Sequence, residues 1–186
     1  MTDVGASLAS GHATAGTMRI RAATDADVPS IADICTRATR QAYEPLVGDA
    51  YVARVIAHWY GADRLRREIA RTDRWFGFSI AERGGVPLGV GGTGLAAEPS
   101  TCELFTLYVD PRCQRQGAGR ALVADAMRQA RAARASRLQV AVMPGNGPAI
   151  AFYEACGFEP AGERPIYAPH GAFGGPDMAL VYIART

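Results

Sequence analysis

The segment 110–119, with the sequence DPRCQRQGAG, has the residue types of an anion-binding turn. It follows an apolar run at 103–109 and precedes an amphipathic segment that we expect to form a helix from Gly119. The first backbone N–H groups of a helix have no partner within it and carry partial positive charge. Glycines let the backbone close around a phosphate, and Arg112 and Arg115 add formal charge. This loop is therefore predicted to bind a phosphate-bearing ligand.

A Gly-x-Gly sequence such as Gly117-Ala118-Gly119 also occurs in dinucleotide-binding turns, but the rest of that motif is missing. Leu122 stands where the third glycine would be, and the glycines lie seven positions beyond Asp110 instead of at the end of the strand. No acidic residue stands at the ribose-binding position. These departures argue against a dinucleotide-binding fold.

Two motifs together resemble the signatures of the GNAT superfamily of N-acetyltransferases. The sequence Gln114-x-x-Gly117-x-Gly119, after the segment 107–111, is similar to the family's acetyl-CoA loop, [RQ]-x-x-G-x-[GA]. The sequence Asn146-x-x-Ala149-x-x-Phe152-Tyr153-Glu154-x-x-Gly157-Phe158 resembles its second signature. The spacing between them fits the family's intervening helix and strand. The resemblance covers residues 18–183, although the part from 22 to 72 is generic.

The resemblance implies an α+β fold with a mixed, mostly antiparallel sheet of seven strands flanked by helices. The fourth and fifth strands of that sheet would splay apart, and the pantetheine arm of acetyl-CoA would lie between them. Acetyl-CoA would serve as co-substrate, and no metal is expected.

The resemblance also assigns cofactor contacts. The backbone N–H groups of 116–120 would bind the pyrophosphate, with Arg112 or Arg115 near the adenosine phosphate. The strand backbone of 107–109 would pair with the pantetheine amides, and the N–H of Val109 would stabilise the oxyanion. Asn146 would hold the pantetheine or an ordered water. The expected cofactor-binding residues are Leu107, Tyr108, Val109, Gln114, Arg115, Gln116, Gly117, Ala118, Gly119, Arg120, Asn146 and Tyr153.

Two side chains are the expected catalytic residues. A phenol with an ordinary pKa of about 10 can protonate a departing thiolate, and Tyr153 is the candidate for that role. An amine must lose a proton before it attacks, and Glu103 is the candidate base, acting through a water. Both residues have structural alternatives. Tyr153 could pack its ring against the sheet, and Glu103 could be a salt-bridged strand end.

Hydrophobic periodicity and turn residues predict the elements that must position these groups. A Gly-rich strand at 86–95 is weak by propensity and indicates a place where another backbone or a ligand comes close. The order of elements favours a mixed sheet. Strands are expected near 18–21, 75–82, 86–95, 103–109, 137–142, 158–166 and 178–183, and helices near 24–41, 49–60, 62–72, 119–134 and 148–156.

Composition bounds the remaining possibilities. The 186 residues predict one domain over 18–186, preceded by a flexible leader at 1–17. All basic residues are Arg, so a Walker phosphate loop and a Schiff-base lysine are excluded. A net charge of +2 gives no basic excess, and we expect neither nucleic acid nor a membrane as partner. The four scattered cysteines favour reduced thiols and a cytoplasmic location over a zinc site.

These observations predict an acetyl-CoA-dependent N-acetyltransferase that acts directly on a primary amine of a small molecule. Polyamines, amino acids and antibiotic-like amines are the expected classes. A protein N-terminus or lysine is the alternative acceptor, and an inactive acyl-CoA-binding sensor is the alternative function; the family resemblance also suggests a homodimer. The acceptor is expected to contact 42–60, the loop after Gly89 and 167–175, with Tyr43, Glu44, Tyr51 and Trp59 attracting a small cationic or amphipathic amine.

Overall fold

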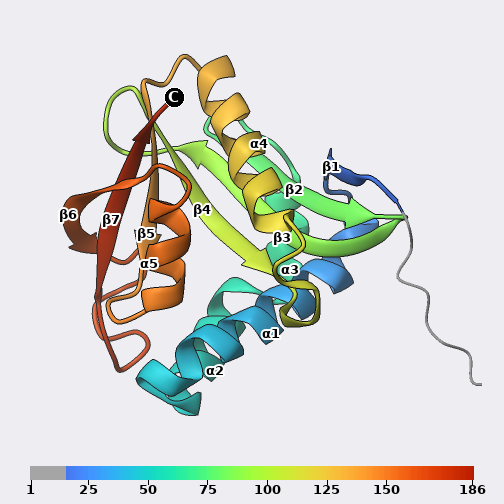
Figure 1. The fold of residues 1–186 in the computed structure, drawn as a ribbon. Helices are drawn as coiled ribbons and strands as arrows, with labels where there is room; N and C mark the ends of the chain where they lie inside the picture. Colours follow the sequence, from blue (N-terminus) through green and yellow to red (C-terminus); the bar gives the residue numbers. More distant parts are fainter. Residues whose placement is uncertain (1–15) are drawn as a thin grey trace, which may run out of the picture.

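A computed structural model describes residues 16–186, so the expected leader lies outside the described residues except for its last two positions. The chain folds into one seven-stranded sheet with helices on both faces (Figure 1). The elements are β1 (Met18–Ala22), α1 (Val28–Val47), α2 (Asp49–Trp59), α3 (Ala62–Ile69), β2 (Trp75–Arg83), β3 (Val86–Leu95), β4 (Thr101–Val109), α4 (Ala118–Ala132), β5 (Arg137–Val142), α5 (Gly147–Glu154), β6 (Glu159–Pro165) and β7 (Met178–Arg185), with short 3-10 turns at Asp25–Asp27 and Pro111–Cys113.

The strands follow the order β1-β2-β3-β4-β5-β7-β6, and all neighbours are antiparallel except β4 and β5. Each expected strand and helix is present close to its expected bounds, which confirms the mixed α+β fold. The largest difference is at α1, which continues past Gln41 to Val47 with Pro45 inside it. Proline removes only one donor near the end of this helix, where Arg40 pairs with both Glu44 and Asp49.

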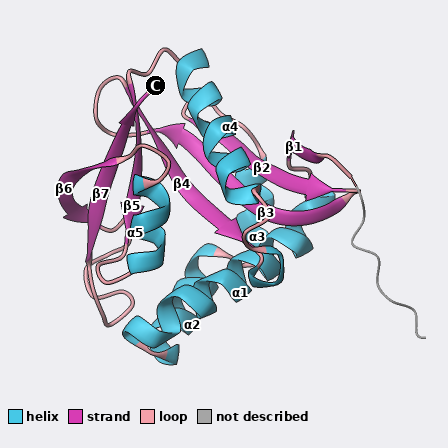
Figure 2. Cartoon of the chain, in the orientation of Figure 1, coloured by secondary structure: helices cyan, strands magenta, loops and turns pink. Residues whose placement is uncertain are grey.

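The parallel pair β4–β5 is joined over only a short stretch. Its pairs are Thr101 with Arg137, Cys102 with Leu138 and Glu103 with Gln139. Beyond them, β4 continues to Val109 and β5 to Val142 without pairing to each other, and Figure 2 shows the two strands diverging. We call this opening between residues 104–109 and 140–142 the wedge. It confirms the expected splay of the fourth and fifth strands.

Each diverging strand is held by its outer neighbour. β5 pairs with β7 along its whole length, and β4 remains paired with β3 up to the contact between Val109 and Gly89. On one face, α4 packs Val123, Ala126 and Ala130 into the core formed with both strands. On the other face, α1 and α3 cover β2 and β3. The sheet can therefore stay open at the wedge without losing its core.

Close packing explains the glycines of β3. A Cβ at Gly92 would lie 2.6 Å from the ring of Trp75, and one at Gly89 would lie 2.8 Å from the carbonyl oxygen of Tyr108. Contacts below 3.0 Å cannot be accommodated without a shift of the neighbouring atoms. The expectation that another backbone comes close to this strand is confirmed. Gly92 also makes room for an indole ring that lines the cavity described below.

No helix within residues 16–186 is both long and apolar enough to cross a bilayer.

An ion-pair cluster attaches the first strand to the sheet and predicts acid sensitivity. Arg21 donates to both carboxylate oxygens of Asp27 at 2.7 Å and to Glu82 at 2.7 Å. Its guanidinium lowers the pKa of the buried Asp27 carboxyl to about 2. The unfolded chain binds this proton near pH 4, so the stabilisation is complete above that pH and is lost as the pH falls toward 2.

Asp27→Asn should therefore lower the free energy of unfolding by about 2 kcal/mol at pH 7. It should also make the free energy of unfolding decrease less between pH 4 and pH 2 than it does in the wild type. Urea denaturation across this range measures both effects. Asp63→Asn is the matched control, because its pair with Arg66 is exposed and should contribute less than about 1 kcal/mol. An Asp27 variant with the pH profile of the wild type would contradict this assignment.

Candidate active site

The loop between β4 and α4 is anchored by one buried carboxylate. Asp110 accepts hydrogen bonds from the backbone N–H of Arg112 at 3.0 Å and from its guanidinium at 2.8 Å. It also accepts one from Arg37 of α1 at 2.8 Å. These donors, with Arg112 first, hold the pKa of the Asp110 carboxyl well below its usual range. Asp110 thus fixes the first part of the loop to the sheet and to α1, on the N-terminal side of Gly117 and Gly119.

Gly117 has the conformation that the start of α4 requires. Its φ of +90° lies in the left-handed region, which favours glycine. The first helical hydrogen bond runs from the N–H of Ala121 to the carbonyl of Gly117 at 3.0 Å. The N–H groups of Ala118, Gly119 and Arg120 come before it and have no partner within the helix. The expected anion-binding donors therefore stand together at the helix start.

Other residues of the expected cofactor loop make contacts of their own. The Gln116 side chain and carbonyl accept hydrogen bonds from Arg83, at 2.8 and 3.2 Å. Gln114 donates to Gln41 of α1 at 2.8 Å. A Cβ at Gly119 would lie 3.2 Å from the ring of Phe152, so this glycine allows α4 to begin close against α5. The two signature motifs thus meet in space.

A bulge in β4 decides which side chains face the cavity. Gly92 pairs with Thr106 while the next residue, Thr93, pairs with Leu104, so Phe105 is an extra residue. Because side chains alternate along a strand, an extra residue changes which face the following positions occupy. Glu103, Phe105, Thr106 and Tyr108 consequently all line one cavity, whereas Leu104 packs into the core with α4.

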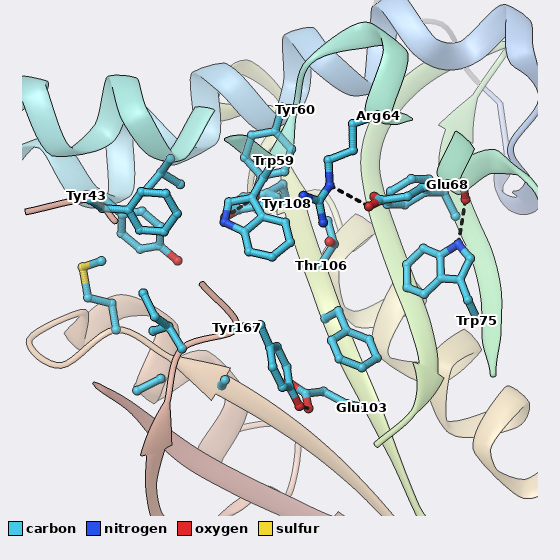
Figure 3. Close-up of a pocket in the computed structure, with 18 of the residues that line it drawn as sticks. Tyr43, Trp59, Tyr60, Arg64, Glu68, Trp75, Glu103, Thr106, Tyr108 and Tyr167 are labelled. Carbon is cyan, nitrogen blue, oxygen red and sulfur yellow. Dashed lines mark hydrogen bonds and ion pairs between the residues drawn. The ribbon is translucent and has the colours of Figure 1, made fainter. Parts of the chain in front are cut away.

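Glu103 stands where the wedge opens, in the last pair that joins β4 to β5. It is only 1% exposed, and both of its oxygens are occupied. Oε2 accepts hydrogen bonds from Gln139 and from the Tyr167 hydroxyl, each at 2.7 Å, and Oε1 is paired with Arg164. Figure 3 shows the Tyr167 side chain beside Glu103. The salt-bridged arrangement expected as the structural alternative is present, and the carboxylate also lines the cavity.

Tyr153 and Asn146 lie on α5, next to β5. Asn146 caps the helix, with its side-chain oxygen accepting from the N–H of Ala149 at 3.3 Å. The Tyr153 ring packs edge-on against Phe152 and Phe158, with centroids 5.3 and 5.5 Å away. Burial raises the pKa of the Tyr153 phenol, as does the nearby phenol of Tyr43. The phenol therefore keeps its proton at neutral pH.

A cavity of about 720 Å³ opens beside the wedge. Its walls come from the helices α1–α3, from β2, β4 and β5, and from the β6–β7 connection. Aromatic side chains line much of it, and Figure 3 shows several of them facing the interior. Thr106 and Tyr108 of β4 and Ala141 of β5 are in this lining, so the wedge forms part of the cavity wall.

The structure brings most of the expected acceptor residues to this cavity but not all of them. Tyr43, Tyr51, Trp59 and Tyr167 line it. Glu44 does not, because its carboxylate is paired with Arg40 on the outer part of α1. The prediction that a loop follows Gly89 is also wrong. This glycine lies inside β3, which continues to Leu95 because it is paired on both sides.

Three phenols form a half-buried group at one end of the cavity. The Tyr60 hydroxyl donates to that of Tyr108 at 3.0 Å. Burial raises the pKa of both phenols well above their ordinary range. The pKa of Tyr43 is raised by the adjacent Tyr108 and by burial. This end of the cavity is therefore polar but uncharged at neutral pH.

Sequence reasoning missed Arg164, Gln139 and the aromatic wall formed by Trp75 and Phe105. Arg164 is one of many arginines and has no motif around it. Its partner Glu103 lies 61 positions away, so only the pairing of β5, β7 and β6 brings them together. Within residues 16–186, no cluster of three His, Cys, Asp or Glu side chains could hold a metal ion.

Comparison with known proteins agrees with this geometry. The model of the Acetyltransferase (GNAT) family matches residues 33–158, more than half of the chain. The chain belongs to the GNAT acetyltransferase family. Mycothiol acetyltransferase of Acidothermus cellulolyticus is 32% identical over 121 residues, covering 55% of this chain and 37% of that relative.

Two further matches extend the comparison. Ribosomal protein bS18-alanine N-acetyltransferase of Escherichia coli is 41% identical over 66 residues, covering 36% of this chain and 45% of that protein. The chain thus aligns with less than half the length of these curated relatives. The PaiA N-acetyltransferase of Thermoplasma acidophilum, solved in complex with coenzyme A, superposes with a TM-score of 0.73 at 16% identity, covering 91% of this chain and 99% of that one. This GNAT member shows the same fold.

The ion pair at the wedge predicts a clear coupling. Arg164→Gln leaves the buried Glu103 carboxylate without its counter-charge and should lower the free energy of unfolding by about 3 kcal/mol. Replacing both residues by Gln removes the uncompensated charge and should restore part of that loss. Urea denaturation of the two single variants and the double variant measures the coupling. Strictly additive effects would show that the two charges do not interact.

Proposed function

We propose that this protein is an acetyl-CoA-dependent N-acetyltransferase that transfers the acetyl group directly to a primary amine. One observation carries the proposal. In a chain of the GNAT family, the free N–H groups at the start of α4 stand beside the open wedge between β4 and β5. The first feature suits a diphosphate, and the second offers unpaired strand backbone to an extended, amide-bearing arm.

The backbone of β4 suggests how the thioester is held. The N–H of Asp110 donates to the carbonyl of Leu88 in β3 at 2.8 Å. Because successive N–H groups of a strand point to opposite sides, the N–H of Val109 points away from β3, toward the wedge. It is therefore available to a thioester carbonyl in the wedge. We assign to Val109 the stabilisation of the oxyanion that forms when the amine attacks.

The proposed chemistry needs one proton acceptor and one proton donor. Glu103 accepts the proton of the incoming ammonium through a water, which frees the nitrogen lone pair to attack the carbonyl carbon. Of the two carboxylates that line the cavity, Glu103 is the one on the strand that also carries Val109. When the C–S bond breaks, Tyr153 protonates the thiolate and recovers its proton from the nitrogen through solvent. No covalent acyl-enzyme is required.

The size of the cavity favours a small-molecule amine as acceptor. Its volume of about 720 Å³ lies in the usual range for small-molecule sites, about 300–1,000 Å³. A protein N-terminus is the second candidate. It is favoured by the similarity to ribosomal protein bS18-alanine N-acetyltransferase. A thiol-release assay with acetyl-CoA and a panel of amines and short peptides separates the two, and absence of release with every acceptor would overturn the proposed activity.

Tyr153→Phe should lower kcat at least about tenfold, because it removes the proposed proton donor while keeping the ring. The affinity for coenzyme A, measured by calorimetric titration, should change little. Tyr182→Phe is the matched control, since Tyr182 is also a buried tyrosine of the same core cluster. Equal kcat values for the Tyr153 and Tyr182 variants would remove Tyr153 from the mechanism.

A further inference from the structure

We propose that the acceptor is a monoamine carried on a large aromatic or similarly flat apolar body, and that polyamines are excluded. This inference rests on the proposed acetyl transfer and names the class of substrate that the cavity selects. It follows from the cavity's exposed rings and from the way in which its charges are already paired.

The cavity presents apolar surface that the protein itself does not cover. Phe105, Tyr167 and Met178 are 40%, 49% and 41% exposed, and all three line this cavity, so their exposed apolar surface is grouped at one site. Phe105 stands between the rings of Trp75 and Tyr167, with centroids 6.0 and 5.6 Å away. Together they form a continuous wall next to Glu103. A flat apolar ligand would bury this wall.

The acidic side chains of the lining are not free to bind a second ammonium. Glu68 accepts from Arg64 at 2.7 Å, and Glu103 is paired with Arg164. The lining holds a third arginine, Arg67, which makes no ion pair with the part of the chain that the structure describes. Positive charge therefore exceeds negative charge in the cavity, which disfavours a ligand with several ammonium groups.

Two of the aromatic rings that line the cavity already have a cation over one face. The guanidinium carbon of Arg64 lies 4.1 Å from the ring centroid of Trp59, and that of Arg164 lies 3.8 Å from the centroid of Tyr167. Each ring already has a cation over one face. Among the expected acceptor classes, polyamines fit this lining least well, since Glu44 is not in the lining and both carboxylates that are present are paired with arginines.

The test compares two amines by calorimetric titration into the full-length protein saturated with coenzyme A. Tryptamine should bind at least about tenfold more tightly than spermidine, because it buries the ring wall and adds one charge instead of several. Thiol release should follow the same order. Spermidine binding as tightly as tryptamine, or binding of neither amine, would overturn the inference.

Removing one positive charge from the cavity gives a second test. Arg64→Gln leaves Glu68 unpaired in the cavity and should narrow the preference for tryptamine by about fivefold or more, through gain of spermidine affinity. Arg66→Gln is the matched control, because it makes the same change on the same helix while its partner Asp63 lies outside the cavity. Equal effects of the two variants would contradict the assigned role of the Arg64 pair.

The result separates this inference from the proposed function. Selective binding of tryptamine without thiol release from acetyl-CoA with any amine or peptide of the panel would overturn the transfer activity and leave the ligand class standing. Thiol release with spermidine equal to that with tryptamine would overturn the ligand class and leave the transfer activity standing.

Discussion

After Glu103 and Gln139, β4 and β5 no longer share hydrogen bonds, and the rest of the site depends on this divergence. Unpaired backbone inside a protein is costly unless something else satisfies it. Here the number of unpaired backbone groups is limited because β3 and β7 keep the outer edges of both strands paired. The inner edges are left available to an extended ligand. The start of α4, with its free N–H groups, and an aromatic cavity then lie on either side of the same opening.

The carboxylate at the head of the wedge joins the parts that line it. Glu103 connects β4 to β5 through Gln139, to β6 through Arg164 and to the β6–β7 connection through Tyr167. A buried charge of this kind needs its partners, since removing one leaves a desolvated ion. The same contacts place the Tyr167 ring beside Phe105 and the Arg164 guanidinium over that ring. The wedge and the aromatic wall of Trp75, Phe105 and Tyr167 are therefore structurally coupled through one side chain.

The sequence predicted the elements well because most of their signals are local. Apolar alternation, turn residues and the glycines before the helix expected from Gly119 depend on neighbouring residues, and the structure places these elements close to their expected bounds. The signature loop could also be anticipated, since free N–H groups at a helix start follow from its position in the chain. The motifs around Gly117 and Tyr153 identified the family, and the family match confirms it.

The aromatic wall of the cavity and the ion pair beside it could not be predicted in the same way. The pairing of Glu103 with Arg164 depends on the order β5-β7-β6, and the shared direction of Glu103 and Tyr108 depends on the bulge at Phe105. Neither leaves a pattern in the sequence. Glu44 was misplaced for a similar reason. A shift of one residue along α1 decides whether a side chain faces the cavity, as Tyr43 does, or pairs with Arg40, as Glu44 does, and composition alone does not show which.

The most direct measurement is a crystal structure of the protein bound to coenzyme A. The account predicts diphosphate density at the backbone N–H groups of 116–120 and a pantetheine arm between 107–109 of β4 and the facing edge of β5. Density for the nucleotide at another surface would contradict it, as would strands β4 and β5 closed into continuous pairing beyond Glu103.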